Sequence, residues 1–275
     1  MPSYQITCLE KDSYELEKIQ PIVWRPSREK ECLTGLTEGL NTALKETLSN
    51  IMRNDRTVLW RPFIPIAAVI FDMDSTLIGQ ETIVEIARAI GIDEEVAKIT
   101  EDAMQGKIDF EQALRARVAL LEGVSTHSFA DIAKRLVLNP GIEEVSNVLF
   151  SKGIPVHLVS GGFQYFANAF AKLLHFSGCH ANALQTNKDV LTGKLDGPIV
   201  CEQAKLRYAK GLIENEKIDR SQLLAIGDGA NDIPMLDYAG CGFGYRPKKQ
   251  LYGVVSGAMQ LTHRPLLDFI DPPKF

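Results

Sequence analysis

The sequence predicts an α/β protein with a doubly wound, mainly parallel sheet, and three observations support this fold class. Short apolar runs suited to strands buried on both faces recur at 66–71, 155–159 and 222–226. Stretches with helical spacing of apolar residues separate these runs, as in alternating β-α units. Polar residues and glycines follow each run directly, where the ligand-binding edge of such a sheet is expected.

The same pattern divides the chain into a core, an insertion and an N-terminal segment. Residues 66–78 and 140–275 carry the strand–helix alternation and are assigned to a Rossmann-like catalytic core. Residues 79–139 contain helical stretches without a strand signal, which indicates an α-helical cap inserted in the core. Residues 1–65 are predicted to form a small α+β segment of unknown role.

The two ends of the chain are less regular than its middle. Residues 3–9 favour a strand, and apolar residues at three- and four-residue steps over 30–53 favour an amphipathic helix. Prolines at positions 62 and 65 indicate a linker after it. In the tail, the run P-L-L-D-F-I predicts a short helix that closes the sheet edge.

Composition is typical of a soluble globular protein, with 45% hydrophobic and 24% charged residues. A formal net charge of -5 argues against a nucleic-acid binder, and no apolar run approaches the roughly 20 residues of a membrane span. The five cysteines are scattered and never form C-x-x-C, which fits reduced thiols and gives no zinc site. We therefore expect a cytoplasmic protein whose partner is neither nucleic acid nor membrane.

Polar clusters at three strand ends carry the candidate chemistry. Asp72 and Asp228 can hold Mg2+, which takes hard oxygen ligands. The loop 160–162 offers a serine hydroxyl and free N–H groups at two glycines for phosphate oxygens, and Lys205 offers a positive charge. Asp72 can attack phosphorus to give an aspartyl-phosphate, while Asp74 can protonate the leaving alcohol and then activate water.

Each of these features has a plainer interpretation when it stands alone. Asp72 and Asp74 can cap a turn after a strand, a Ser-Gly-Gly sequence is usually a turn, and Lys205 can be a solvated helix residue. Glu81 can be a favourable first-turn carboxylate, and Arg117 a surface ion-pair partner. The order of the clusters along the chain favours the functional interpretation.

The set F-D-M-D-S-T, S-G-G, Lys205 and G-D-G-A-N-D resembles the haloacid dehalogenase-like phosphatases. Within that family, four stretches are similar to those of phosphatases that act on O-phospho-L-serine: 81–87, 106–118, 159–163 and 228–236. The resemblance covers about residues 66 to 245.

The resemblance implies a role for each matching core position. Asp72 matches the nucleophile, and Asp74 matches the acid/base, whose backbone carbonyl also binds metal. Asp228 matches the remaining protein ligand of Mg2+. Asp232 matches a residue that supports the metal site through a water molecule or by contacting the ligand residues. Other positions match contacts to the phosphate or the bound substrate: Ser160, Gly161, Lys205 and Asn231.

In the cap, the resemblance implies that Glu81 receives the substrate ammonium and Arg117 its carboxylate, with Met104 and Phe110 as an apolar wall. The spacing supports this independently, because Phe110 and Arg117 share one helix face while Arg115 is expected to point elsewhere. A fork-shaped guanidinium suits a bidentate carboxylate.

The resemblance thus implies a Mg2+-dependent phosphatase that releases L-serine and phosphate from a small phosphate ester, in the last step of serine biosynthesis. Two alternatives stay open. One is a related phosphatase, or a phosphotransferase to an alcohol such as homoserine. The other is a non-catalytic regulator that binds an amino acid through residues 1–65.

Bacterial members of this family often carry an N-terminal regulatory domain of the ACT type. Residues 1–65 are shorter than that domain and show no clear β-α-β-β-α-β pattern, so we expect no amino-acid feedback control. We interpret the segment as a truncated relic, or as a contact between two copies that would make a homodimer.

Overall fold

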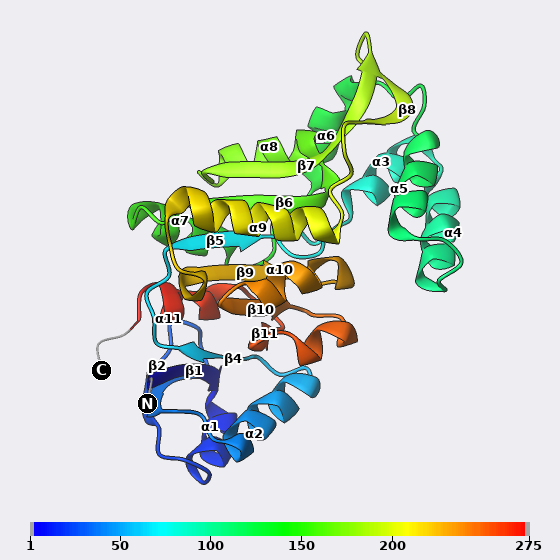
Figure 1. Ribbon diagram of the computed structural model, residues 1–275. Coiled ribbons are helices and arrows are strands. Elements are labelled where there is room, and N and C mark those ends of the chain that lie inside the picture. The colour runs from blue at the N-terminus through cyan, green and yellow to red at the C-terminus, as the bar shows by residue number, and fades with distance from the viewer. Residues whose placement is uncertain (1–2, 273–275) are drawn as a thin grey trace.

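The computed structural model describes residues 3–272, and one sheet of eleven strands runs through it (Figure 1). The strand order is β2-β3-β1-β4-β11-β10-β9-β5-β6-β7-β8. The strands are β1 (Ser3–Leu9), β2 (Val23–Pro26), β3 (Cys32–Glu38), β4 (Val58–Pro62), β5 (Ala68–Phe71), β6 (Val156–Phe163), β7 (Gly178–Asn187), β8 (Val190–Asp196), β9 (Leu223–Gly227), β10 (Cys241–Tyr245) and β11 (Gly257–Met259).

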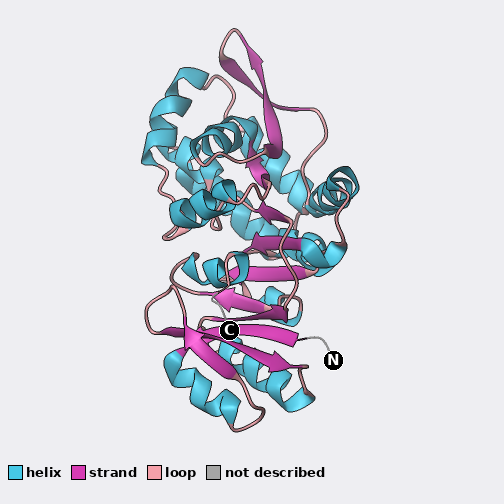
Figure 2. Ribbon diagram, turned by 90° about the vertical axis from the view of Figure 1, so that its left-hand side faces the viewer, coloured by secondary structure: helices cyan, strands magenta, loops and turns pink. Residues whose placement is uncertain are grey.

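Helices cover both faces of this sheet (Figures 1 and 2). The α-helices are α1 (Glu10–Glu17), α2 (Thr42–Arg53), α3 (Thr82–Ile90), α4 (Asp93–Met104), α5 (Phe110–Ala119), α6 (Phe129–Arg135), α7 (Ile142–Ser151), α8 (Gln164–Leu173), α9 (Glu202–Glu216), α10 (Ile233–Tyr238) and α11 (Leu267–Ile270). Five short 3-10 turns lie between them: η1 (Thr126–Ser128), η2 (Arg220–Gln222), η3 (Ala230–Asp232), η4 (Lys249–Gly253) and η5 (Arg264–Leu266). Among the described residues, none of these helices combines the length and apolar character needed to cross a membrane.

The centre of the sheet is parallel and confirms the predicted fold class. Strands β11, β10, β9, β5, β6 and β7 pair in parallel, and Phe71 at the end of β5 lies opposite Ile226 and Leu158. All four residues of β5 are buried, as expected for a strand covered on both faces. The carboxyl ends of β5, β6 and β9 therefore meet at one edge of the core.

Alternation along β5 separates two apolar layers. Val69 and Phe71 belong to the layer formed with α7, α8 and α11, whereas Ala68 and Ile70 belong to the layer formed with α1, α2, α9 and α10. Successive strand residues point to opposite faces, so the continuous apolar run of β5 supplies both layers. This two-sided burial holds the strand end rigidly where polar residues begin.

The cap consists of α3 to α6, inserted between β5 and α7. Gly91 ends α3 with φ 74, a left-handed conformation that glycine adopts without strain. Asp109 caps α5 by accepting a hydrogen bond from the Gln112 N–H group, and the Gln112 side chain accepts one from the Asp109 N–H group. Helix α6 ends at Arg135, because the chain after it runs back beside the loop that follows β5.

The N-terminal segment differs from the sequence prediction. It has the order β1-α1-β2-β3-α2-β4, so the expected absence of a β-α-β-β-α-β pattern was wrong. Residues 32–38, predicted as the start of a helix, form β3, and only 42–53 are helical. Apolar residues at 33 and 36 fit a helical period, but pairing with β1 and β2 overrides that local signal.

Part of the predicted linker belongs to the sheet, because Arg61 and Pro62 end β4, while residues 63–65 lie outside the strands. Residues 58–62 form β4, which pairs antiparallel with both β1 and β11 and joins the N-terminal strands to the parallel core. The tail does form the predicted helix α11, but α11 packs on a sheet face, while β2 and β8 are the edges. The expectation that this tail closes a sheet edge was therefore wrong.

Candidate active site

The loop after β5 carries the first pair of site residues. Asp72 directly follows the strand, is only 3% exposed, and its N–H group donates to the Ile226 carbonyl at 2.9 Å. The Met73 carbonyl accepts from the N–H groups of Leu77 and Ile78 at 2.8 and 3.0 Å. The chain therefore turns back immediately, which holds the Asp72 side chain at the carboxyl edge of the sheet.

Two side chains outside this loop, those of Asn139 and His263, contact its backbone. The Thr76 carbonyl accepts a hydrogen bond from Asn139 Nδ2 at 2.8 Å and faces His263 Nε2 at 3.0 Å. Burial lowers the pKa of His263 to about 3, so its ring is neutral and stacks on Tyr245. The C-terminal tail thereby helps to position the loop that carries Asp72.

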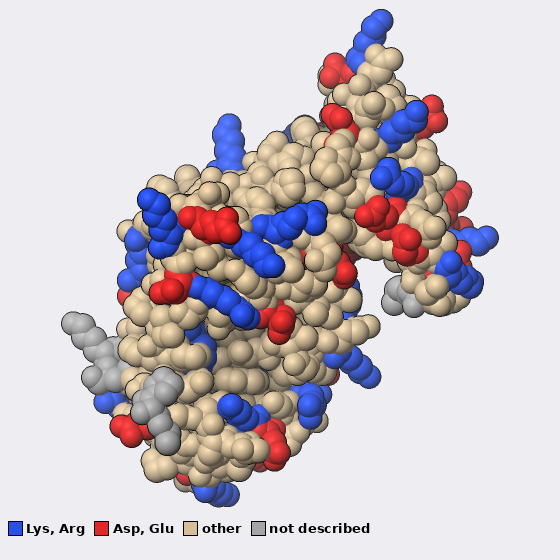
Figure 3. All heavy atoms as spheres, in the orientation of Figure 1, with Lys and Arg blue, Asp and Glu red and all other residues tan. Residues whose placement is uncertain are grey.

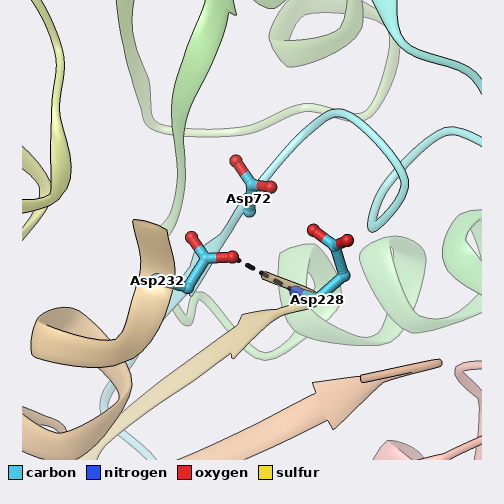
Figure 4. A group of neighbouring side chains, drawn as sticks. All are labelled: Asp72, Asp228 and Asp232. Atoms are coloured by element: carbon cyan, nitrogen blue, oxygen red, sulfur yellow. Dashed lines mark hydrogen bonds between the residues drawn. The ribbon is translucent and has the colours of Figure 1, made fainter. Parts of the chain in front are cut away.

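Asp72, Asp228 and Asp232 converge from the loop after β5, the end of β9 and η3 (Figure 4). One oxygen atom of each carboxylate lies within 4.8 Å of the others. Lys205 of α9 is fully buried, and its Nζ donates to Asp72 Oδ1 at 2.6 Å and to Asp232 Oδ1 at 2.7 Å. Residues distant in the sequence therefore form one charged cluster.

The charges in this cluster do not balance. Burial raises the pKa of Asp72 well above its ordinary range, and Asp232 adds to this effect, while Lys205 opposes it. Burial also raises the pKa of Asp228, against the effect of Lys248. Burial alone would lower the pKa of Lys205, but Asp232 and Asp72 more than reverse this, so the ammonium persists. Three carboxylates thus outnumber the two ammonium groups that pair with them, Lys205 and Lys248. Such a set of hard oxygen donors fits a divalent cation such as Mg2+.

Asp232 has contacts that orient its neighbours. Its Oδ2 accepts from the N–H groups of Asp228 and Gly229, both at 3.2 Å, while its Oδ1 accepts from Lys205. A Cβ at Gly227 would lie 2.5 Å from Asp232 Cγ, so β9 must end in glycine for this carboxylate to fit. The side chain of Asp232 thus fixes the turn that carries Asp228.

Asp74 faces the glycine-rich loop 160–162, which forms the irregular end of β6, where the pairing with β7 shifts register between Val159 and Phe163. Its carboxylate accepts from the Thr82 N–H group at 3.3 Å and from the Thr82 hydroxyl at 3.0 Å. A Cβ at Gly162 would lie 2.6 Å from Asp74 Oδ2, so the close approach of loop and carboxylate requires glycine there. Burial raises the pKa of Asp74, and Glu81 contributes, while the Thr82 hydrogen bonds oppose this shift.

The glycine-rich loop is held by its own serine and by an asparagine from β7. Ser160 Oγ accepts from the Gly162 N–H group at 2.9 Å, so the prediction that this N–H group is free was wrong. Asn182 Nδ2 donates to the Gly161 carbonyl at 2.7 Å, and Asn182 Oδ1 accepts from the Val200 N–H group at 2.8 Å. Ser160, Gly161 and Asn182 therefore form one rigid element beside Asp74.

The cap brings its predicted residues to the same region. Glu81 Oε1 accepts a hydrogen bond from Ser75 Oγ at 2.8 Å, and the Phe110 ring lies 3.3 Å from where a Cβ at Gly161 would stand. Burial lowers the pKa of Arg117, while Glu81 and Asp74 oppose this effect. The guanidinium of Arg117 is half-buried and contacts the Ala113 carbonyl and the Thr100 hydroxyl. The side chain of Met104 lies outside the described part of the structure.

A cavity of about 580 Å3 opens between cap and core, where the surface in Figure 3 is hollowed. Phe110 and Arg115 line it from α5, and Glu202 and the half-buried Asn231 line it from the core. The expectation that Arg115 points away from the Phe110 side was wrong, because a long arginine side chain can curve from a neighbouring helix position to the cavity.

Sequence reasoning missed three residues that contact the site: Thr82, Asn182 and Lys248. Thr82 begins α3 beside Glu81, and its hydroxyl in a helix first turn was an available signal. Asn182 lies in β7 and Lys248 in the loop after β10, and no local pattern in the sequence distinguishes them. Only the arrangement of β6, β7 and β10 brings them to the site.

Residues 69–237 match the family model described as haloacid dehalogenase-like hydrolase. The chain belongs to this family, which confirms the resemblance predicted from the sequence. Among its relatives, the phosphoserine phosphatase of Lactococcus lactis is 37% identical over 204 residues, covering 74% of this chain and 94% of that protein. The phosphoserine phosphatase of Methanocaldococcus jannaschii is 41% identical over 172 residues, covering 62% and 82%.

Solved structures extend this similarity to the whole chain. A haloacid dehalogenase family hydrolase from Salmonella enterica serovar Typhi superposes with a TM-score of 0.89 at 25% identity, covering 99% of both chains. A structure described as a phospho-aspartyl intermediate analogue of phosphoserine phosphatase superposes with a TM-score of 0.70 at 36% identity, covering 76% of this chain and all of that one.

Proposed function

We propose that this protein is a Mg2+-dependent phosphatase that hydrolyses O-phospho-L-serine to L-serine and phosphate. The observation that carries the proposal is the cluster of Asp72, Asp228, Asp232 and Lys205 at the carboxyl edge of the parallel sheet. The relatives named phosphoserine phosphatase support the choice of substrate. We place the reaction in the cytoplasm, as the last step of serine biosynthesis.

In this mechanism, Asp72 attacks the phosphorus atom and the bond between phosphorus and the serine oxygen breaks. Asp74 gives its proton to that oxygen, for which its raised pKa suits it, since the carboxyl stays protonated to higher pH than usual. The resulting aspartyl-phosphate is attacked by water, and Asp74 takes the proton that water loses. Phosphate leaves and the Asp72 carboxylate is restored.

The charged neighbours position these steps. Lys205 holds Asp72 Oδ1 and offers a positive charge to the phosphoryl oxygens. Asp72 and Asp228 would hold Mg2+, with the Asp74 carbonyl as a further ligand and Asp232 supporting. When bound, the cation would offset the charge of the carboxylates and of the transferred phosphoryl group. Ser160 and the Gly161 N–H group would contact the phosphate.

The cap supplies the groups that select the amino acid. Glu81 would receive the substrate ammonium and Arg117 its carboxylate, while Phe110 excludes water over Gly161. Asn231, at the cavity wall, would offer a polar contact from the core side. The two charges of a small zwitterion therefore each meet a group of opposite sign.

A phosphate-release assay over a panel of small phosphate esters, with Mg2+ and with a chelator, tests this function. Phosphoserine should be hydrolysed fastest, and the chelator should abolish turnover. Adding homoserine or other alcohols, followed by product analysis, distinguishes hydrolysis from transfer to an acceptor. Absence of turnover on every ester, or equal turnover in chelator, would contradict the proposal.

Arg117→Ala provides a sharper test of substrate choice. Loss of the guanidinium group that receives the substrate carboxylate should raise KM for phosphoserine by about 10- to 100-fold. KM for phosphoethanolamine, which lacks the carboxylate, should change by much less. Arg88→Ala is the control elsewhere in the cap, because its guanidinium is 58% exposed and pairs with Glu85 outside the cavity wall, and it should leave this discrimination intact. Equal effects of Arg117→Ala on both substrates would remove this residue from carboxylate recognition.

A further inference from the structure

A second lysine contacts the carboxylate cluster, at the aspartate that Lys205 does not contact. Lys248 lies between β10 and η4, and its N–H group donates to the Asp228 carbonyl at 2.8 Å. Its Nζ lies 3.0 Å from Asp228 Oδ2, so backbone and side chain both contact the same aspartate. No sequence motif pointed to this residue.

The two lysines differ in their surroundings. Lys205 is fully buried and contacts two carboxylates, so it cannot leave without exposing an unpaired charge cluster. The side chain of Lys248 is 60% exposed, whereas that of Asp228 is 8% exposed. Lys248 can therefore swing into solvent at little cost, while Asp228 cannot follow it.

The position of Lys248 sets it in competition with a divalent cation. A carboxylate that pairs with an ammonium at 3.0 Å is a weaker ligand for a metal, because the two positive charges repel each other. Burial alone would lower the pKa of Lys248, but Asp228 more than reverses this and Glu81 adds to it. The ammonium thus stays charged, on the side of Asp228 that faces the cap.

We propose that Lys248 is a displaceable counter-ion, which pairs with Asp228 in the absence of a divalent cation and thereby weakens the affinity of the site for that cation. This inference rests on the proposed function, since it requires a cation at Asp72 and Asp228. Binding of the cation breaks the contact between Lys248 and Asp228, and the released ammonium moves into solvent at the mouth of the site. The lysine therefore sets the cation concentration at which the site fills.

Direct cation binding tests this competition without reference to catalysis. Mn2+ binding followed by electron paramagnetic resonance, and Mg2+ binding by calorimetry, should show about tenfold tighter affinity for Lys248→Met than for the native protein. The difference should shrink as the salt concentration rises, because the lysine is exposed. Lys248→Arg keeps the charge and should stay near the native affinity.

Lys249→Met is the matched control, because the adjacent Lys249 is exposed and pairs with no carboxylate among the described residues. Its cation affinity should equal that of the native protein. Unchanged or weaker binding by Lys248→Met, with thermal unfolding in chelator confirming an intact fold, would overturn the inference.

The result separates this inference from the proposed function. If the native protein binds Mn2+ and hydrolyses phosphoserine while Lys248→Met binds no tighter, only the role of Lys248 fails. If the native protein binds no divalent cation, the proposed cation site fails and the role of Lys248 fails with it. A structure with the cation bound should show Lys248 Nζ beyond hydrogen-bond distance from Asp228.

Discussion

Asp268 and Asp72 are both buried aspartates, but their surroundings differ. Asp268 of α11 is fully buried, and its carboxylate accepts from Ser27 Oγ at 2.6 Å, the Arg28 N–H group at 3.1 Å and Thr7 Oγ1 at 3.4 Å. At the sheet edge, Asp72 has Asp232 and Asp228 as close neighbours. The first carboxylate meets only hydrogen-bond donors, whereas the second accepts from Lys205 and has two further carboxylates beside it.

The difference separates a structural acid from a candidate catalytic one. Burial raises the pKa of Asp268, but the hydrogen bonds from Ser27, Arg28 and Thr7 all oppose this shift. For Asp72, burial and the nearby Asp232 raise the pKa together, and Lys205 offsets this only in part. Burial alone therefore does not identify a functional carboxylate, whereas neighbouring like charge that is only partly offset does.

The largest expected effect is that of Asp72→Asn. An amide cannot attack phosphorus, so kcat should fall by about a thousandfold or more. Phosphate release measures the loss, and circular dichroism checks that the fold persists. Asp237→Asn, at an exposed position of α10, is the control and should keep native turnover. Turnover of Asp72→Asn within tenfold of native would contradict the nucleophile assignment.

Asp268→Ala should damage stability instead of catalysis. Removing this carboxylate leaves the Ser27 hydroxyl and the Arg28 N–H group without their acceptor, which should cost about 2 to 4 kcal/mol of unfolding free energy. Urea unfolding measures the loss, while kcat of the folded fraction stays native. Asp271→Ala, an exposed ion-pair partner of Lys152, should cost less than about 1 kcal/mol. A loss of kcat in Asp268→Ala without a loss of unfolding free energy would contradict the assignment of Asp268 to a structural role.

The smallest effect is a pH dependence in chelator. Burial raises the pKa of Asp228 above its ordinary value of 3.8, so the folded chain binds this proton more tightly than the unfolded chain. The stability that the proton contributes is present at low pH and is lost as pH rises above 3.8 through the folded pKa. Asparagine at this position binds no such proton, so the stability of Asp228→Asn does not show this fall with rising pH.

The advantage of Asp228→Asn in unfolding free energy should therefore grow with rising pH, by something on the order of 1 kcal/mol. Thermal unfolding in chelator at several pH values measures it. If the advantage of Asp228→Asn in unfolding free energy instead shrank as pH rose, Lys248 would affect the pKa of Asp228 more strongly than burial does.

The sequence was sufficient where the signal is local and repeated. The apolar run of β5, the helix spacing of α7 and α9, and the order of the acidic motifs predicted the core and the cluster around Asp72. The spacing of apolar residues reflects whether both faces of a strand or one face of a helix are buried. It therefore predicts the local structure without knowledge of distant contacts. The resemblance to the haloacid dehalogenase-like phosphatases then implied a role for each matching residue.

The sequence was insufficient where distant pairing decides the outcome. Residues 32–38 have a helical period but form β3, because β1 and β2 offer backbone partners. Asn182 and Lys248 contact the site only through the packing of β6 with β7 and the path of the chain after β10. The N–H group of Gly162 is occupied because of the local rotamer of Ser160, which no spacing pattern encodes.

The pairing of β4 with β11 also bears on self-association through exposed backbone. Without β4, the short strand β11 would present unpaired amide and carbonyl groups at the margin of the parallel core, a template onto which another chain could add. Instead, the row of strands continues to β2, which ends in Pro26 and so lacks one amide for a further neighbour. The N-terminal strands therefore shield the core from unwanted strand addition.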